Sequence, residues 1–278
     1  MDWIDALILG IVQGLSEYLP ISSSGHLEIF KSMLGMDLDP DGSLQLSVML
    51  HVATVLSTIV VLWREFVPLC TSFFTVRRDA GFYYVCKILL SCIPVAIVGL
   101  FFKDQVKQLF EGNLTVVGIC LMVTAALLCV AYFYRTAPSE AQLQRADGFR
   151  PRDITWADAF VIGIAQAVAV LPGLSRSGST IATGIILGDK REQVAQFSFF
   201  MVIIPILGEG LLDLRKMLSP AAEAAGSDID ITALAVGFVS AFVVGCVACK
   251  WMLEIVKRGK LVWFALYCLL MGIACVVW

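Results

Sequence analysis

Charged residues are scarce in this chain. Asp, Glu, Lys and Arg make up 15% of its 278 residues, and hydrophobic residues make up 59%. Soluble globular proteins carry roughly 25% charged residues. The composition, with a mean hydropathy of +0.85, therefore excludes an ordinary soluble domain and indicates that the solvent is lipid. The chain also lacks basic tracts and runs in which basic and aromatic residues alternate, and its net charge is −3. These features exclude nucleic acid as a partner.

A signal peptide is lacking too. Asp2 and Asp5 stand where a positively charged leader would begin, so we expect the first segment to stay in the mature protein. The nine cysteines do not form a disulfide framework, because most lie inside apolar runs and are expected to pack there. Cys246 and Cys249 form a C-x-x-C without a second pair, which makes metal or redox use the weaker alternative.

Long uncharged runs predict the membrane spans. A helix needs roughly 20 apolar residues to cross the hydrocarbon, with allowance for charged ends that reach the interface. Six runs qualify, two of them short: Leu44 to Leu62, Ile88 to Phe102, Leu114 to Tyr134, Gln193 to Gly208, Ile231 to Cys249 and Leu261 to Trp278.

An internal repeat divides the chain. WIDALILGIVQ (3–13) is matched in register by WADAFVIGIAQ (156–166), which indicates a duplication. Each copy continues into a Pro/Ser/Gly loop and a second short apolar stretch. Non-helical backbone at membrane depth is tolerated only where protein or a wet cavity satisfies it, so residues 3–35 and 156–188 are predicted to be re-entrant helix hairpins whose tips meet inside the protein.

These elements predict an all-α polytopic membrane protein made of two inverted-topology repeats. Each repeat is a re-entrant hairpin followed by three transmembrane helices, at residues 1–134 and 156–278, and residues 135–155 form a cytoplasmic linker. A re-entrant hairpin returns to the side of the membrane from which it entered. The three crossings that follow the first hairpin therefore place the second copy on the opposite side of the membrane. Most basic residues would then face the linker side, so both termini and the first hairpin are predicted to face outside the cytoplasm.

The first loop, GLSEYLPISSSGH, collects groups suited to phosphate chemistry. Gln13 and Glu17, four apart, share a helix face, and their oxygens could hold a hard divalent cation. His26 could serve as nucleophile or general base, with Ser23 as the rival nucleophile. His26 as a packing residue remains an alternative. Ser24 and His51 are expected to support the site from outside it.

The second loop, PGLSRSGST, indicates an anion site. Arg176 is its one basic residue, and a guanidinium matches phosphate oxygens. Burying such a charge costs about 2.5 to 3.5 kcal/mol, so it needs a partner; a purely structural pair with Glu17 is the simplest alternative. The remaining candidate phosphate ligands are hydroxyls and glycines that let backbone amides approach a phosphate: Ser175, Ser177, Ser179, Thr180, Gly173 and Gly178.

Together the two motifs resemble those of the bacterial undecaprenyl-diphosphate phosphatases, also called bacitracin resistance proteins, over the whole length. The first motif runs from Gln13 and Glu17 through Pro20, Ser23 and Gly25 to His26, and the second from Pro172 to Thr180. Gln13 takes the Gln option where the family also uses Glu, and Glu28 and Glu209 have no family counterpart. The functional residues that the resemblance implies are Gln13, Glu17, Ser23, His26, Ser175, Arg176 and Thr180.

The resemblance implies removal of the terminal phosphate of undecaprenyl diphosphate, which recycles the lipid carrier for peptidoglycan and other envelope polymers. It also implies dependence on Mg²⁺ or Ca²⁺ and a site open to the outer face of the bacterial plasma membrane. The alternative is an inverted-repeat transporter or flippase of a lipid phosphate or other anion. A carrier does not need the cluster of Glu17, Ser23 and His26, so the residues favour hydrolysis.

Overall fold

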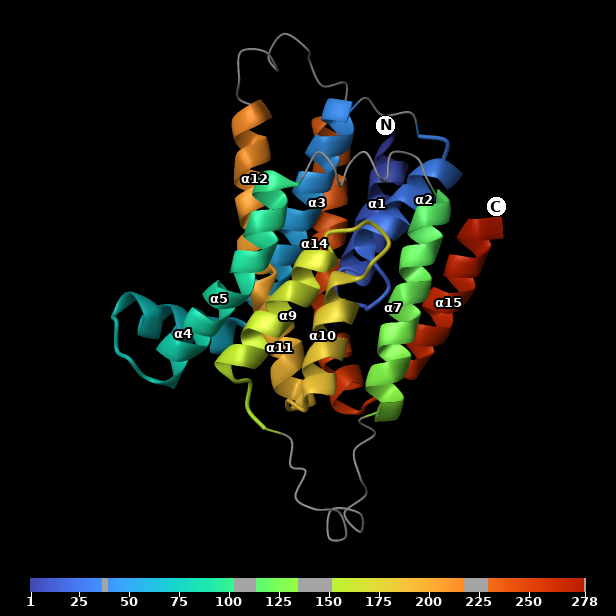
Figure 1. Cartoon of the computed structure of the whole chain (residues 1–278). Coiled ribbons are helices and arrows are strands. Elements are labelled where there is room, and N and C mark those ends of the chain that lie inside the picture. Colours follow the sequence, from blue (N-terminus) through green and yellow to red (C-terminus); the bar gives the residue numbers. More distant parts are fainter. Residues whose placement is uncertain (37–39, 103–113, 135–151, 218–229, 278) are drawn as a thin grey trace.

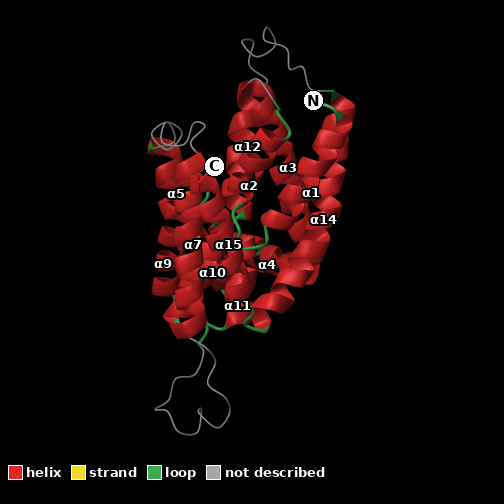
Figure 2. Ribbon diagram, turned by 90° about the vertical axis from the view of Figure 1, so that its right-hand side faces the viewer, coloured by secondary structure: helices red, strands yellow, loops and turns green. Residues whose placement is uncertain are grey.

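The computed structural model describes residues 1–36, 40–102, 114–134, 152–217 and 230–277, and in these ranges the regular elements are helices, apart from one isolated β-bridge. They stand together in one bundle, with the start of the chain and its C-terminus toward the same end (Figure 1; Figure 2). The all-α prediction is confirmed for this part of the chain. The helices are α1 (Trp3–Ser16), α2 (Ser23–Met33), α3 (Pro40–Val61), α4 (Trp63–Phe74), α5 (Ala80–Phe101), α7 (Leu114–Tyr134), α9 (Trp156–Val168), α10 (Arg176–Leu187), α11 (Arg191–Met201), α12 (Ile203–Met217), α14 (Ile231–Lys257) and α15 (Val262–Val277).

Four segments among the described residues are long and apolar enough to cross a membrane: Ala80–Phe101, Leu114–Phe133, Arg191–Leu212 and Ile231–Lys257. A fifth is reached if α3 and α4 count as one bent span. The predicted span from Leu261 to Trp278 corresponds to α15, which has 16 residues. At 1.5 Å per residue α15 is only about 24 Å long, so this member of the six predicted spans falls short of a full crossing by length.

Both predicted breaks occur where the repeats place them. α1 ends at Ser16 and α2 begins at Ser23, while α9 ends at Val168 and α10 begins at Arg176. The two repeats also start alike, because Asp2 and Thr155 each cap their helix in a reciprocal capping box with an aspartate three residues later. The caps determine where each short helix begins, and the start of the helix in turn sets the position of the loop that follows its C-terminal end.

The two loops touch each other. The Ser177 hydroxyl donates a hydrogen bond to the Leu19 carbonyl oxygen at 3.2 Å, and a Cβ atom on Gly25 would lie 3.3 Å from the Gly173 Cα. The prediction that the tips meet inside the protein is confirmed. The contact brings together residues more than 150 positions apart.

Helices from the two halves of the chain interleave. α1 packs along α14, α7 along α15, and α5 along α9. Small residues allow these close approaches: a Cβ atom on Gly118 would lie 2.6 Å from the Gly272 carbonyl oxygen, and one on Gly163 would overlap the Ser91 carbonyl oxygen. The site loops are thus held between helices contributed by both halves.

α4 leaves the bundle. The chain bends by 91° at Leu62, and Figure 1 shows α4 projecting sideways from the other helices. Leu62 does not cap α4 with its side chain, and neither Pro nor Gly stands at the break. The predicted span from Leu44 to Leu62 corresponds to α3, which ends at Val61 and qualifies as a span only together with α4. The separate helix α4 was not predicted.

A cluster of charged residues lies where the second broken helix begins and ends, near the start of α9 and the end of α10. Asp189, between α10 and α11, is buried, and its carboxylate lies 3.8 Å from the Arg152 guanidinium, which also donates to Asp158 at 2.8 Å. Burial, and secondly the Asp158 carboxylate, raise the pKa of Asp189 to about 7. Of the predicted linker, residues 135–151 lie outside the described residues.

Candidate active site

Glu17 is the residue around which the site is built. It follows α1 directly, and its side chain is only 7% exposed. One carboxylate oxygen accepts hydrogen bonds from the Ser23 hydroxyl at 2.8 Å and from the Gln13 amide nitrogen at 2.9 Å. The other lies 3.7 Å from an Arg176 guanidinium nitrogen. These contacts offset the cost of burying a carboxylate and join the first loop to the second.

Two helix N-termini converge on this ion pair. Ser23 is the first residue of α2 and Arg176 the first of α10. The serine before each caps its helix: the Ser22 hydroxyl accepts from the Gly25 amide at 3.3 Å, and the Ser175 hydroxyl from the Gly178 amide at 3.1 Å. A helix N-terminus carries partial positive charge and favours an anion beside it. The repeat therefore supplies this feature twice.

A small polar cavity lies between the loops, and we call it the hydroxyl pocket. Hydroxyl groups dominate its wall, and the guanidinium adds a cationic donor, so a phosphate group would meet donors on several sides. The lining residues are Ser16, Glu17, Ser22, Ser23, Ser24, Ala169, Leu174, Ser175, Arg176 and Ser177.

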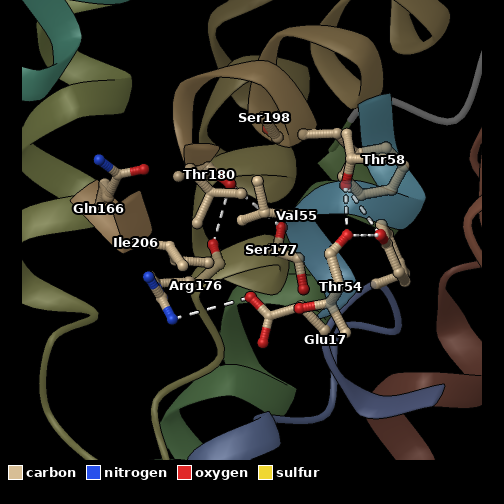
Figure 3. Close-up of a pocket in the computed structure, with 13 residues that line it drawn as sticks. Glu17, Thr54, Val55, Thr58, Gln166, Arg176, Ser177, Thr180, Ser198 and Ile206 are labelled. Carbon is tan, nitrogen blue, oxygen red and sulfur yellow. Dashed lines mark hydrogen bonds and ion pairs between the residues drawn. The ribbon is translucent and has the colours of Figure 1, made fainter. Parts of the chain in front are cut away.

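A second cavity, the Gln166 cavity, adjoins the same ion pair. Figure 3 shows the Glu17 and Arg176 side chains pointing toward each other in it. Gln166 Nε2 and the Ser198 hydroxyl are buried along its wall without a hydrogen-bond partner. Both cavities share Glu17, Arg176 and Ser177, so the ion pair separates two spaces of different character.

The structure brings most of the second motif to these cavities. Ser175 and Ser177 line the hydroxyl pocket. Thr180 lines the Gln166 cavity, and its hydroxyl donates to the Arg176 carbonyl oxygen at 2.9 Å, whereas the Ser179 hydroxyl is buried without a partner and lines neither cavity. The predicted phosphate contact of Thr180 therefore requires its hydroxyl to exchange partners.

The two glycines of this motif pack against α7. Gly173 has a φ of +89°, and a Cβ atom there would lie 2.5 Å from the Val117 carbonyl oxygen. A Cβ atom on Gly178 would meet Ser175 and Thr124 at about 3 Å. Neither glycine lines the two cavities. Their role in the structure is close packing, and their contact with phosphate stays a prediction.

His26 is not turned toward Glu17 and Ser23. Its ring is buried, with Nδ1 2.8 Å from the Ser22 carbonyl oxygen and Nε2 2.6 Å from the Tyr267 hydroxyl. It lines neither cavity. The structure therefore places Glu17 in contact with both Ser23 and Arg176. The His26 ring, on α2, contacts Ser22 and Tyr267 instead.

His51 and Ser24 lie at the edge of the cluster. His51 on α3 has Nε2 3.8 Å from a Glu17 carboxylate oxygen, and its Nδ1 lies 2.8 Å from the Ser47 carbonyl oxygen. Ser24 is exposed, and its hydroxyl lies 3.5 Å from that of Ser22. Both positions agree with supporting rather than central roles.

Comparison with known proteins decides the family. The sequence model described as "Bacitracin resistance protein BacA" matches residues 6–274. This chain belongs to that family. Among its relatives in the BacA family, a Parabacteroides distasonis protein named "Undecaprenyl-diphosphatase" is 52% identical over 98% of this chain and 97% of its own length. Proteins of the same name from Bacteroides fragilis and Methanosphaera stadtmanae are 50% and 33% identical, each over 100% of this chain and 98% of their own length.

The sequence motifs predict a divalent cation, and part of a suitable donor set is present. The Oε1 atom of Gln13 is buried without a partner, beside the Glu17 carboxylate to which Gln13 donates. Carboxylate and amide oxygens are the ligands that Mg²⁺ and Ca²⁺ prefer. Among the described residues no group of three His, Cys, Asp or Glu side chains could hold a metal. The two residues therefore fit a cation that takes its other ligands from phosphate and water.

Sequence reasoning missed Tyr267, Gln166 and Ser198. Gln166 could have been found, because it recurs in register with Gln13 in the repeat. Tyr267 stands 241 positions from the histidine it contacts, in an apolar helix whose sequence gives no sign of the partnership. In this BacA protein the last helix thus reaches the first loop.

Proposed function

We propose that this protein hydrolyses undecaprenyl diphosphate to undecaprenyl phosphate and inorganic phosphate. The observation that carries the proposal is the contact of Ser23, Glu17 and Arg176 in one hydroxyl-lined pocket at two helix N-termini. The names of relatives up to 52% identical over nearly the whole chain supply the substrate. Such an enzyme recycles the lipid carrier of peptidoglycan and envelope synthesis and confers resistance to bacitracin.

Arg176 and the helix N-termini would bind the diphosphate. The guanidinium is 25% exposed and makes a single long contact with Glu17, so its other donors can face phosphate oxygens. The hydroxyls of Ser175 and Ser177 add neutral donors from the same wall. The isoprenoid tail would extend into the surrounding membrane lipids. Charge stabilisation of this kind is the main requirement of phosphoryl transfer.

Ser23 would act as the nucleophile. Its hydroxyl already donates to Glu17, which can take the proton as Oγ attacks the terminal phosphorus. The bond between that phosphorus and the bridging oxygen breaks, and undecaprenyl phosphate leaves. Water then attacks the phosphorus of the phosphoserine, and the bond from phosphorus to Ser23 Oγ breaks. Glu17 returns its proton to Oγ, inorganic phosphate departs with the water oxygen and one of its protons, and the other water proton passes to the solvent.

Glu17 and Gln13 would hold a divalent cation, Mg²⁺ or Ca²⁺, beside the diphosphate. When bound, such an ion neutralises negative charge on phosphate oxygens. A chelator should therefore stop phosphate release, and either cation should restore it. Activity that survives chelation would remove the ion from the proposal and leave Arg176 as the main source of positive charge.

The fold would consist of two inverted repeats, 1–134 and 156–278, joined by a cytoplasmic linker at 135–155. The paired breaks, the paired capping boxes and the matching serine caps support a duplication. The start of α1 and the end of α15 lie toward the same end of the bundle (Figure 1), as an outward orientation of both termini requires. The site would then open to the outer face of the bacterial plasma membrane.

Phosphate release by the purified protein tests the proposal. In detergent it should liberate orthophosphate from a polyprenyl diphosphate, and His26→Ala or Arg176→Ala should nearly abolish this activity. A lipid-phosphate carrier is the competing function, and the Gln166 cavity beside the ion pair would suit it. Transport in vesicles without phosphate release from any polyprenyl diphosphate would establish the carrier and reject the hydrolase.

A further inference from the structure

The His26 imidazole is fixed at both nitrogens. On one side the Ser22 carbonyl oxygen lies 2.8 Å from Nδ1 and also accepts the backbone amide of His26 at 3.1 Å. On the other side the Tyr267 hydroxyl lies 2.6 Å from Nε2, and the two rings stack with their centroids 5.6 Å apart. The ring is only 3% exposed. Its plane and its orientation are therefore determined by two residues from opposite ends of the chain.

These contacts select one tautomer. A carbonyl oxygen only accepts hydrogen bonds, so Nδ1 carries the proton that bonds to Ser22. In the neutral ring Nε2 then has the lone pair, and the Tyr267 hydroxyl donates to it. Ser22 presents its carbonyl from an unusual backbone conformation, with a φ of 72°.

The Tyr267 hydroxyl is the unusual group in its helix. α15 otherwise consists of apolar residues, small residues and cysteines, in the sequence VWFALYCLLMGIACVV. Phenylalanine would provide the same ring stacking, so packing alone does not explain a hydroxyl there. Tyr267 is 38% exposed, and it covers the one nitrogen of His26 that can gain a proton.

His26 lies on the same helix as the proposed nucleophile. Ser23 and His26 are three positions apart on α2, which places them on one face of that helix. We propose that Tyr267 is the positioning residue for His26: its hydroxyl and its stacked ring hold the imidazole as the Nδ1–H tautomer, with Nε2 as the hydrogen-bond acceptor. The proposal rests on the proposed phosphatase function and adds to it a residue from the last helix.

Tyr267→Phe tests the kinetic consequence, because it keeps the ring and removes the hydroxyl. Loss of one neutral hydrogen bond should lower kcat about 5- to 10-fold, with KM within about twofold because Tyr267 lies outside both cavities. Tyr83→Phe is the matched control, since Tyr83 contacts Trp156 and Phe82 by ring edges. It should retain wild-type kcat.

Combination with His26→Ala separates positioning from a structural or direct role. If Tyr267 acts through His26, adding Tyr267→Phe to His26→Ala should cost less than about twofold. The same fold loss in both backgrounds, or no loss in the wild-type background, overturns the proposal. Failure of the wild-type protein to release phosphate would instead count against the proposed function.

Nuclear magnetic resonance tests the tautomer without substrate. The chain has two histidines, so His26 is the only one in the His51→Gln variant. With ¹⁵N-labelled histidine, one ring nitrogen should give a protonated signal assigned to Nδ1 and the other an unprotonated signal assigned to Nε2. Tyr267→Phe should move the Nε2 signal toward that of a free lone pair. A proton on Nε2 in the starting protein, or an unchanged signal in the variant, overturns the proposal.

Discussion

Ser23→Ala distinguishes a nucleophile from a residue that merely positions Glu17. The hydroxyl donates to the Glu17 carboxylate at 2.8 Å. If that bond is its whole role, the substitution removes one hydrogen bond to a charged group, worth about 1.5 to 3 kcal/mol, and kcat should fall about 10- to 150-fold. If Ser23 Oγ attacks phosphorus, the bond-forming atom is gone, and the loss should exceed about 1,000-fold.

The assay is phosphate release from a polyprenyl diphosphate under single-turnover and steady-state conditions. Ser24→Ala is the matched control, since Ser24 is the next residue, is exposed, and has its hydroxyl 3.5 Å from that of Ser22. It should stay within about threefold of wild type, because the Ser24 hydroxyl makes only this one long contact with the described residues. Substrate labelled in the terminal phosphate should leave acid-stable label on the wild-type protein and none on Ser23→Ala.

A loss of less than about 150-fold with Ser23→Ala would refute the assignment of Ser23 as nucleophile. So would acid-labile label that depends on His26, because phosphohistidine hydrolyses in acid whereas phosphoserine survives. Either result would leave Ser23 as a partner of Glu17 and would transfer the attack to His26 or to water.

Three further substitutions test other parts of the structure. Arg176→Lys keeps the charge but loses the planar fork, so kcat/KM should fall about 10- to 100-fold, measured by phosphate release. Asp189→Asn should raise the thermal unfolding midpoint at pH 8 but not near pH 4, because the raised pKa of Asp189, about 7, means that its contribution to stability is lost as pH rises through that value. Gly163→Ala should lower the unfolding midpoint, since the new methyl group overlaps the Ser91 carbonyl and such overpacking costs about 1 to 3 kcal/mol.

Each of these has a clear contrary result. Wild-type kcat/KM in Arg176→Lys would mean that a point charge is enough at that position. For Asp189→Asn, a midpoint difference from wild type that stays constant with pH would show that its carboxylate does not titrate in this range. Gly99→Ala, in open space on α5, is the control for the packing prediction, and an equal destabilisation of both glycine variants would contradict it.

The sequence predicts the broken helices, and it offers the pair of Glu17 and Arg176 as an alternative to a ligand site, because these signals are local. Isolated charges at Glu17 and Arg176 are costly at membrane depth, and Pro, Ser and Gly mark the loops around them. The 91° bend at Leu62 has no such marker and depends on the surroundings of α3 and α4. The contact between His26 and Tyr267 spans 241 positions, so local patterns carry no trace of it.

The interleaving of helices also governs when the protein can become active during its synthesis. α1 packs on α14 and α7 on α15, and these partners are translated after every other described helix. The residues of both loops have all been translated by Thr180, yet until α14 and α15 insert, α1 lacks the helix along which it packs and His26 lacks Tyr267. A chain truncated before α14 would therefore contain every residue of the two site motifs and still lack an assembled site.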